Sequence, residues 1–171
     1  VSAAQVAVTL PSRTEGELNF VDPATTLYAR FFAIKRVNEE LYRIRRYQRW
    51  MSATLLRMTF AYSGADESPS KEDSIFNAYC RFIRSNTREA DISCLVGPRD
   101  VLVVMPETPL EAAREVASKL ADFALSIQDQ LADFNGDVAV RDGTVFFGAA
   151  LGSLSFDEFL DRLDEALEAG V

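Results

Sequence analysis

Arg88 and Asp91 are the residues whose types and spacing offer the clearest chemistry in this chain. They stand three positions apart, where a helical pattern ends and the apolar run Ile92–Val96 begins. An arginine can donate two parallel hydrogen bonds to the edge of a guanine or stack on its ring, and a carboxylate can accept from adjacent N–H groups. Together they could bind a purine. The alternative is a surface ion pair at a helix end.

The segment after this pair predicts a β-hairpin. Two apolar runs rich in β-branched residues, Ile92–Val96 and Val101–Met105, flank the turn residues Gly97-Pro98-Arg99-Asp100. Asp100 is expected to serve as a turn residue, because aspartate accepts hydrogen bonds from its own local backbone. Arg88 and Asp91 would therefore lie where the chain enters the hairpin.

Composition limits the possible functions. The 171 residues suit one domain, and the net charge of −8 argues against broad nucleic-acid binding. No apolar run reaches the ~18 residues of a membrane span, so a cytoplasmic protein is expected.

Cys80 and Cys94 lack metal-ligand spacing and are expected to be buried reduced thiols. The absence of His excludes Ser-His and Cys-His catalysis. Residues 1–20 are interpreted as a linker or N-terminal extension to an upstream regulatory domain, and residues 21–171 as the domain.

The patterns along the chain alternate between helices and strands. Start signals, apolar periodicity and turn residues predict these elements in order: a helix from Asp22-Pro23 to about Arg46, a strand over Ala53–Phe60, a helix from Ser70 to Asn86-Thr87, the hairpin, a helix from Thr108-Pro109, a second hairpin of Asp137–Val140 and Thr144–Leu151 around Arg141-Asp142-Gly143, and a helix from Ser155 to Gly170. This order indicates an α/β (α+β) fold of ferredoxin-like type, with a mixed central sheet flanked by helices.

Several short motifs in this order resemble the GGDEF family, the diguanylate cyclase domain, over almost the whole chain. Asp22 to Arg30 is similar to that family's D-x-L-T-G-L-x-N-R, Glu40-x-x-Arg43-x-x-Arg46 to its E-x-x-R-x-x-R, and Pro106-Glu107-Thr108 to its L-P-x-T. Phe146–Ala150 and Phe159–Ala166 resemble its closing strand and helix. The resemblance implies a GGDEF-type βααββαβ fold and places Gly97-Pro98-Arg99-Asp100-Val101 on the G-G-D-E-F signature.

The same resemblance implies that the cyclase site has been lost. In the family, the signature and a first-strand D-x-D-x-F motif hold divalent cations, whereas this chain reads Leu56-Arg57-Met58-Thr59-Phe60 and carries Arg99 at the tip. Joining two GTP molecules requires Mg²⁺, which needs oxygen ligands. No catalytic residue, metal site or cofactor is therefore expected. Asp73 falls where the family has a guanine-binding Asp, but a capping box opened by Ser70 is the favoured interpretation.

The resemblance also implies that a second site of the family is retained. The family's inhibitory R-x-x-D motif lies five residues before the signature and binds the product cyclic di-GMP, and Arg88 and Asp91 have that spacing from Gly97. Lys119 resembles a basic contact of that site, with a solvated helix lysine as an equal alternative. The resemblance implies a non-catalytic cyclic di-GMP receptor that signals to a protein effector or adaptor. The alternative is a nucleotide-independent protein-interaction scaffold with a GGDEF fold.

Overall fold

The computed structural model describes residues 20–62, 68–130 and 134–170, so nearly all of the predicted linker, residues 1–20, lies outside the described residues. The elements are α1 (Arg30–Tyr47), β1 (Trp50–Tyr62), α2 (Pro69–Asn86), β2 (Ile92–Leu95), β3 (Asp100–Pro106), α3 (Leu110–Gln130), β4 (Gly136–Gly148), the short 3₁₀ turn η1 (Ala149–Leu151) and α4 (Phe156–Ala169). Within these ranges, no helix is both long and apolar enough to cross a membrane.

The four strands form one sheet in the order β2-β3-β1-β4. This is the ferredoxin-like arrangement, so the predicted α+β fold is confirmed. The prediction of a mixed sheet was wrong in one respect, because the pairings of β1 with β3, β1 with β4 and β2 with β3 are all antiparallel. Each helical connection passes over one intervening strand, so parallel strands are never neighbours.

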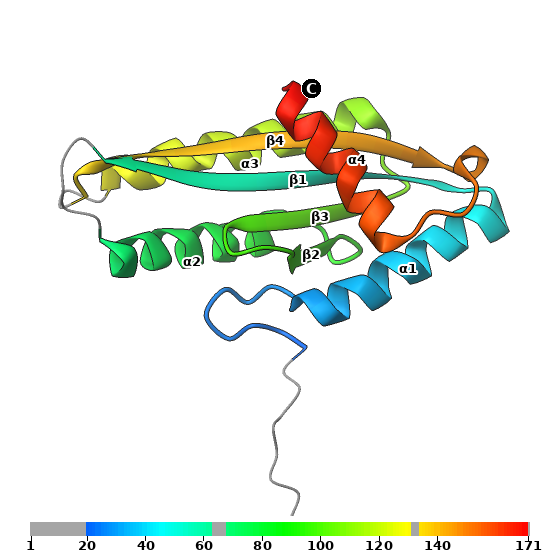
Figure 1. The fold of residues 1–171 in the computed structure, drawn as a ribbon, viewed down its shortest axis with the longest axis horizontal. Helices are drawn as coiled ribbons and strands as arrows, with labels where there is room; N and C mark the ends of the chain where they lie inside the picture. Colours follow the sequence, from blue (N-terminus) through cyan, green and yellow to red (C-terminus); the bar gives the residue numbers. More distant parts are fainter. Residues whose placement is uncertain (1–19, 63–67, 131–133, 171) are drawn as a thin grey trace, which may run out of the picture.

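Helices cover both faces of the sheet (Figure 1). α1 and α4 lie on one face and α2 and α3 on the other, and each pair encloses its own apolar core. The side chains of β1 alternate between the two cores: Ala53 and Leu55 face α1 and α4, whereas Leu56 and Met58 face α2 and α3. Burial on both faces explains why these strands read as continuous apolar runs in the sequence.

The second predicted hairpin does not exist. Arg141-Asp142-Gly143 lies in the middle of β4, which pairs with β1 along its whole length, opposite Arg57, Leu56 and Leu55. Gly143 was misinterpreted as a turn residue. A Cβ at Gly143 would come within 2.3 Å of the backbone nitrogen of Leu167, so this glycine is needed for the close approach of α4 to the sheet.

The chain ahead of α1 also differs from the prediction. The Asp22 carboxylate accepts from the backbone nitrogen and the hydroxyl of Thr25 at 2.8 and 2.7 Å, which closes a turn instead of starting a helix. Tyr28 then pairs with β2, donating to the Ser93 carbonyl and accepting from the Leu95 nitrogen. This pairing covers an edge of the sheet that would otherwise be open.

Local signals predicted other features correctly. The capping box of α4 is present, because Ser155 and Glu158 exchange side-chain and backbone hydrogen bonds. Cys80 and Cys94 are both free and buried, as expected for structural thiols. Burial raises the pKa of the Cys80 thiol to about 12, which keeps it protonated and unreactive.

The Asp142 carboxyl on β4 is expected to make the free energy of unfolding depend on pH. Burial, and then the nearby negative charge of Asp122 on α3, raise the pKa of the Asp142 carboxyl. The folded state therefore binds this proton more tightly than the unfolded chain does, so stability is lost as the pH rises from the unfolded-state pKa through the folded-state pKa. We expect Asp142→Asn to increase the free energy of unfolding at neutral pH and to lose that advantage near pH ~3. Urea unfolding at both pH values measures this, and an equal gain at both would contradict it.

Candidate functional site

Arg88 and Asp91 form a closed, hydrogen-bonded loop between α2 and β2. The Nη2 atom of Arg88 lies 2.7 Å from Oδ1 of Asp91, and its Nε lies 3.2 Å from both carboxylate oxygens. The backbone nitrogen of Arg88 donates to Oδ2 of Asp91 at 2.8 Å, and the Asp91 nitrogen donates to the Arg88 carbonyl at 3.0 Å. The structure therefore brings the predicted pair together and fixes the geometry of the guanidinium.

The two side chains differ greatly in exposure. The Asp91 side chain is 4% exposed, whereas that of Arg88 is 59% exposed. In this conformation a ligand can reach the guanidinium but not the carboxylate, whose oxygens are occupied by Arg88. The hydrogen bonds that the Arg88 guanidinium donates to the Asp91 carboxylate raise the pKa of Arg88, so the guanidinium remains charged. Within the described part of the chain, Nη1 of Arg88 makes no hydrogen bond.

Thr108 is a third member of this site that sequence reasoning missed. Its Oγ1 accepts from Nη2 of Arg88 at 2.6 Å and donates to the Pro106 carbonyl at 3.1 Å. Its backbone carbonyl accepts from the Ser52 hydroxyl at 2.8 Å, which ties the turn to β1. The sequence suggested a helix start and an L-P-x-T-like motif at Thr108, and neither signal indicates a contact with Arg88.

Lys119 lies on the side of α3 that faces α2. Phe123 of α3 stacks on Phe82 of α2 with ring centroids 3.4 Å apart, and the two helices run antiparallel (Figure 1). One turn from Phe123 toward the start of α3 is Lys119, and one turn from Phe82 toward the end of α2 is Asn86. The exposed Lys119 is therefore placed near the turn that precedes Arg88. No hydrogen bond or ion pair joins it to Arg88 or Asp91 in the residues described.

The hairpin tip is held by arginine. Asp100 is the first residue of β3 and not a free turn residue, because Arg57 of β1 binds both of its oxygens at 2.9 and 3.0 Å. Arg57 also lies 2.9 Å from Asp164 of α4. Hydrogen bonding to Asp100 raises the pKa of the Arg57 guanidinium, which therefore remains charged.

Arg99 forms a second ion pair at the tip. Its Nη2 lies 2.7 Å from Asp73 of α2, and its guanidinium carbon lies 5.2 and 5.6 Å from the ring centres of Phe76 and Phe60. The prediction that Asp73 completes a capping box was wrong. α2 begins at Pro69 with no side-chain cap, and Asp73 instead binds Arg99 at the hairpin tip.

The residues at the tip do not fit a divalent cation. In the described ranges, no three Asp, Glu or Cys side chains lie together in a group that could hold a metal ion. Three carboxylates near the tip, Glu72, Asp73 and Asp100, each lie within ion-pair distance of an arginine. A cation there would have to displace both guanidinium groups.

Comparison with solved structures identifies the class of fold. The GGDEF domain of DgcB from Caulobacter crescentus, solved in complex with c-di-GMP, matches with a TM-score of 0.74 at 12% identity, over 88% of this chain and 89% of that chain. The GGDEF domain of FimX from Pseudomonas aeruginosa matches with a TM-score of 0.69 at 11% identity, over 90% and 94%. Diguanylate cyclase SiaD from Pseudomonas aeruginosa, in complex with its activator SiaC, matches with a TM-score of 0.68 at 21% identity, over 89% and 58%.

These matches show that the chain has the fold of GGDEF domains. The chain spans little more than half of the SiaD chain and nearly all of the FimX domain. Searches against family models and against curated proteins give no match. The fold is thus shared at identities of 11–21%, and the chemistry has to be argued from this chain's own side chains.

Proposed function

We propose that this chain is a degenerate GGDEF domain that binds cyclic di-GMP at Arg88 without synthesising it, and that it signals occupancy to a protein partner. The observation that carries the proposal is the exposed guanidinium of Arg88, held in one orientation by the buried Asp91. Because Nε and Nη2 of Arg88 are occupied by Asp91 and Thr108, the exposed Nη1 can donate to the O6 or N7 atom of a guanine, and the planar guanidinium can stack on a base. Its place five residues before Gly97 agrees with the inhibitory motif that the sequence resembles.

The three predicted site residues have different roles in this proposal. Arg88 contacts the ligand, and Asp91 positions Arg88, because its own oxygens are already occupied. Lys119 supplies a second positive charge near the end of α2, where a phosphate of the dinucleotide could lie. The DgcB domain with the same fold was solved with c-di-GMP, which supports the choice of ligand.

The absence of cyclase activity is part of the proposal. Arg57 binds Asp100, and Arg99 binds Asp73 and lies 3.5 Å from Glu72, so a Mg²⁺ ion carrying GTP would have to compete with an arginine for each of these carboxylates. We expect no cyclic di-GMP when the protein is incubated with GTP and either Mg²⁺ or Mn²⁺. Chromatography of the nucleotides measures this, with an active GGDEF cyclase as the positive control. Dinucleotide formed above the no-protein background would contradict this part of the proposal.

A protein partner is proposed because binding without catalysis needs a recipient of the signal. SiaD, which has the same fold, was solved in complex with its activator SiaC, so a protein of this fold can associate with a regulator. We place the chain in the cytoplasm, together with its ligand.

Calorimetry tests the binding proposal. Titration of the protein with cyclic di-GMP is expected to give saturable heat, and cyclic di-AMP to bind at least about tenfold more weakly, because adenine presents a donor where guanine has the O6 acceptor. The two ligands share the same phosphates and sugars, so the difference isolates the base. No heat at about 100 μM cyclic di-GMP would exclude even modest affinity and leave the scaffold alternative.

A further inference from the structure

The Arg88 side chain has one hydrogen-bond partner outside its own loop. Asp91 belongs to the same turn as Arg88, so this pair is a local feature of the connection between α2 and β2. Thr108 lies 20 positions further along the chain, between β3 and α3, and it is only 6% exposed. The hydrogen bond from Arg88 to Thr108 therefore joins the guanidinium directly to a distant, buried part of the fold.

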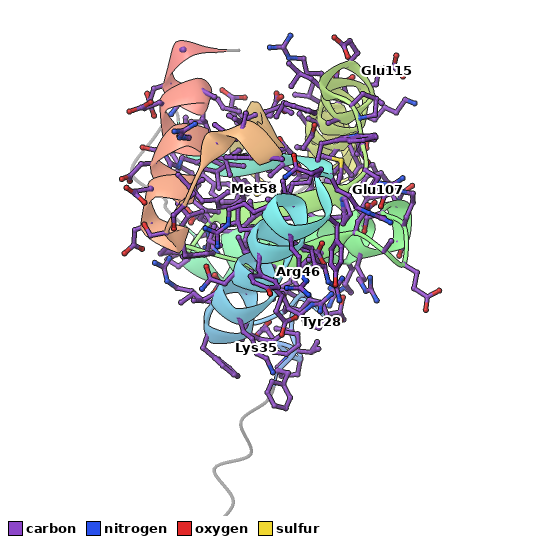
Figure 2. The ribbon with its side chains drawn as sticks, turned by 90° about the vertical axis from the view of Figure 1, so that its right-hand side faces the viewer. Tyr28, Lys35, Arg46, Met58, Glu107 and Glu115 are labelled. Atoms are coloured by element: carbon purple, nitrogen blue, oxygen red, sulfur yellow. The ribbon has the colours of Figure 1, made fainter. Side chains whose placement is uncertain are left out.

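The turn that carries Thr108 is fastened to β1. The Glu107 nitrogen donates to the Trp50 carbonyl at 3.0 Å, and the Ser52 hydroxyl donates to the Thr108 carbonyl at 2.8 Å. Figure 2 looks onto the end of the molecule that carries this turn and labels Glu107, the residue next to Thr108. Because β1 is a central strand of the sheet, these bonds give the Thr108 side chain a fixed position.

The Thr108 hydroxyl can act toward Arg88 only as an acceptor. It donates its single proton to the Pro106 carbonyl at 3.1 Å, which leaves its lone pairs for Nη2 of Arg88 at 2.6 Å. Nη2 carries two hydrogens, and its other acceptor is Oδ1 of Asp91 at 2.7 Å. Because the guanidinium is planar, acceptors for both hydrogens of Nη2, together with the contacts of Nε, define the plane of the whole group.

We propose that Thr108 is a positioning residue of the cyclic di-GMP site, whose hydroxyl holds the Arg88 guanidinium in the plane that a guanine meets. Thr108 is buried and acts through Arg88. The inference rests on the proposed binding of cyclic di-GMP at Arg88. A side chain that already has its bound orientation loses less conformational entropy when the ligand arrives, so removal of the hydroxyl weakens binding even though Arg88 is still present.

Thr108→Val tests this role, because valine has nearly the shape of threonine but lacks the hydroxyl. We expect calorimetric titration to show an affinity for cyclic di-GMP about five- to tenfold lower than that of the wild type. Thr108→Ser restores the hydroxyl and is expected to bind within about twofold of the wild type. If serine binds as weakly as valine, the hydroxyl is not the group that positions Arg88.

Thr144→Val is the matched control. Thr144 is 3% exposed, and its hydroxyl lies 3.1 Å from the hydroxyl of Thr54, between β4 and β1. The same substitution there removes a buried hydrogen bond without changing the contacts of Arg88, so we expect an unchanged affinity for cyclic di-GMP. Urea unfolding measures how far each valine variant is destabilised. Equal losses of affinity at Thr108 and Thr144 would mean that destabilisation alone weakens binding, and would overturn the proposal.

The double variant Arg88→Ala with Thr108→Val shows whether the effect passes through Arg88. We expect it to bind cyclic di-GMP no more weakly than Arg88→Ala alone, since Thr108 then has no guanidinium to hold. A further loss of affinity in the double variant would contradict a role through Arg88. A wild-type protein without saturable heat would refute the proposed function and this role with it. Wild-type binding with unaltered affinity in a folded Thr108→Val protein would refute this inference alone.

Discussion

Replacing Arg88 with alanine is expected to lower the affinity for cyclic di-GMP by about ten- to a hundredfold. The reason is the loss of a charged hydrogen-bond donor to a guanine edge and of the planar group that stacks on the base, which together contribute ~1–3 kcal/mol. Arg88 is the exposed member of the pair, so its removal takes away the group that the ligand meets. Calorimetric titration of both proteins at the same ionic strength measures the difference.

Two further variants separate this effect from a general change of charge. Arg162→Ala removes an arginine on α4, on the opposite face of the sheet, and is expected to bind cyclic di-GMP like the wild type. Arg88→Lys keeps the charge but loses the planar guanidinium that stacks on a base and is held by Asp91, and is expected to bind about tenfold more weakly. Thermal melting checks that the protein remains folded in each variant, in which the buried Asp91 carboxylate loses its contacts with the Arg88 side chain. Unaltered affinity in a folded Arg88→Ala protein would exclude Arg88 as a ligand contact.

Gly143→Ala is expected to destabilise the fold by about 3 kcal/mol or more, or to prevent folding. An added Cβ would lie 2.3 Å from the nitrogen and 2.6 Å from the Cα of Leu167, and 2.7 Å from the carbonyl oxygen of Leu163. All three are backbone atoms of α4, so no side chain can rotate away to make room. α4 would have to move off the sheet, exposing the core around Phe159. The free energy of urea-induced unfolding measures the effect.

Gly148→Ala is the matched control, because it makes the same substitution in the same strand. There the closest atom to an added Cβ belongs to the side chain of Phe146, at 3.3 Å. Since that ring is partly exposed and can shift, we expect a cost below about 1 kcal/mol. Equal costs at Gly143 and Gly148 would mean that the close approach of α4 does not constrain Gly143.

The parts of the fold that the sequence predicted are those specified by local patterns. Apolar periodicity predicted α2 and α4, and the turn residues Gly97-Pro98 predicted the β2–β3 hairpin. The errors arose where a residue type serves a distant contact. Gly143 was taken for a turn although it accommodates α4, and Asp22-Pro23 was taken for a helix start although Asp22 closes a turn.

The candidate site divides in the same way. Arg88 and Asp91 are three residues apart, so their spacing alone predicted that they would meet. The contacts of Arg88 with Thr108 and of Arg57 with Asp100 join residues 20 and 43 positions apart. They depend on the register of the sheet, which the sequence pattern did not specify.

The structure of the protein with saturating cyclic di-GMP tests the central claim most directly. We predict a guanine edge or ring against the guanidinium of Arg88, with the Asp91 carboxylate still bonded to the backbone nitrogen of Arg88. Solvent alone beside Arg88 in crystals grown with the ligand, or a dinucleotide bound elsewhere on the domain, would contradict the account.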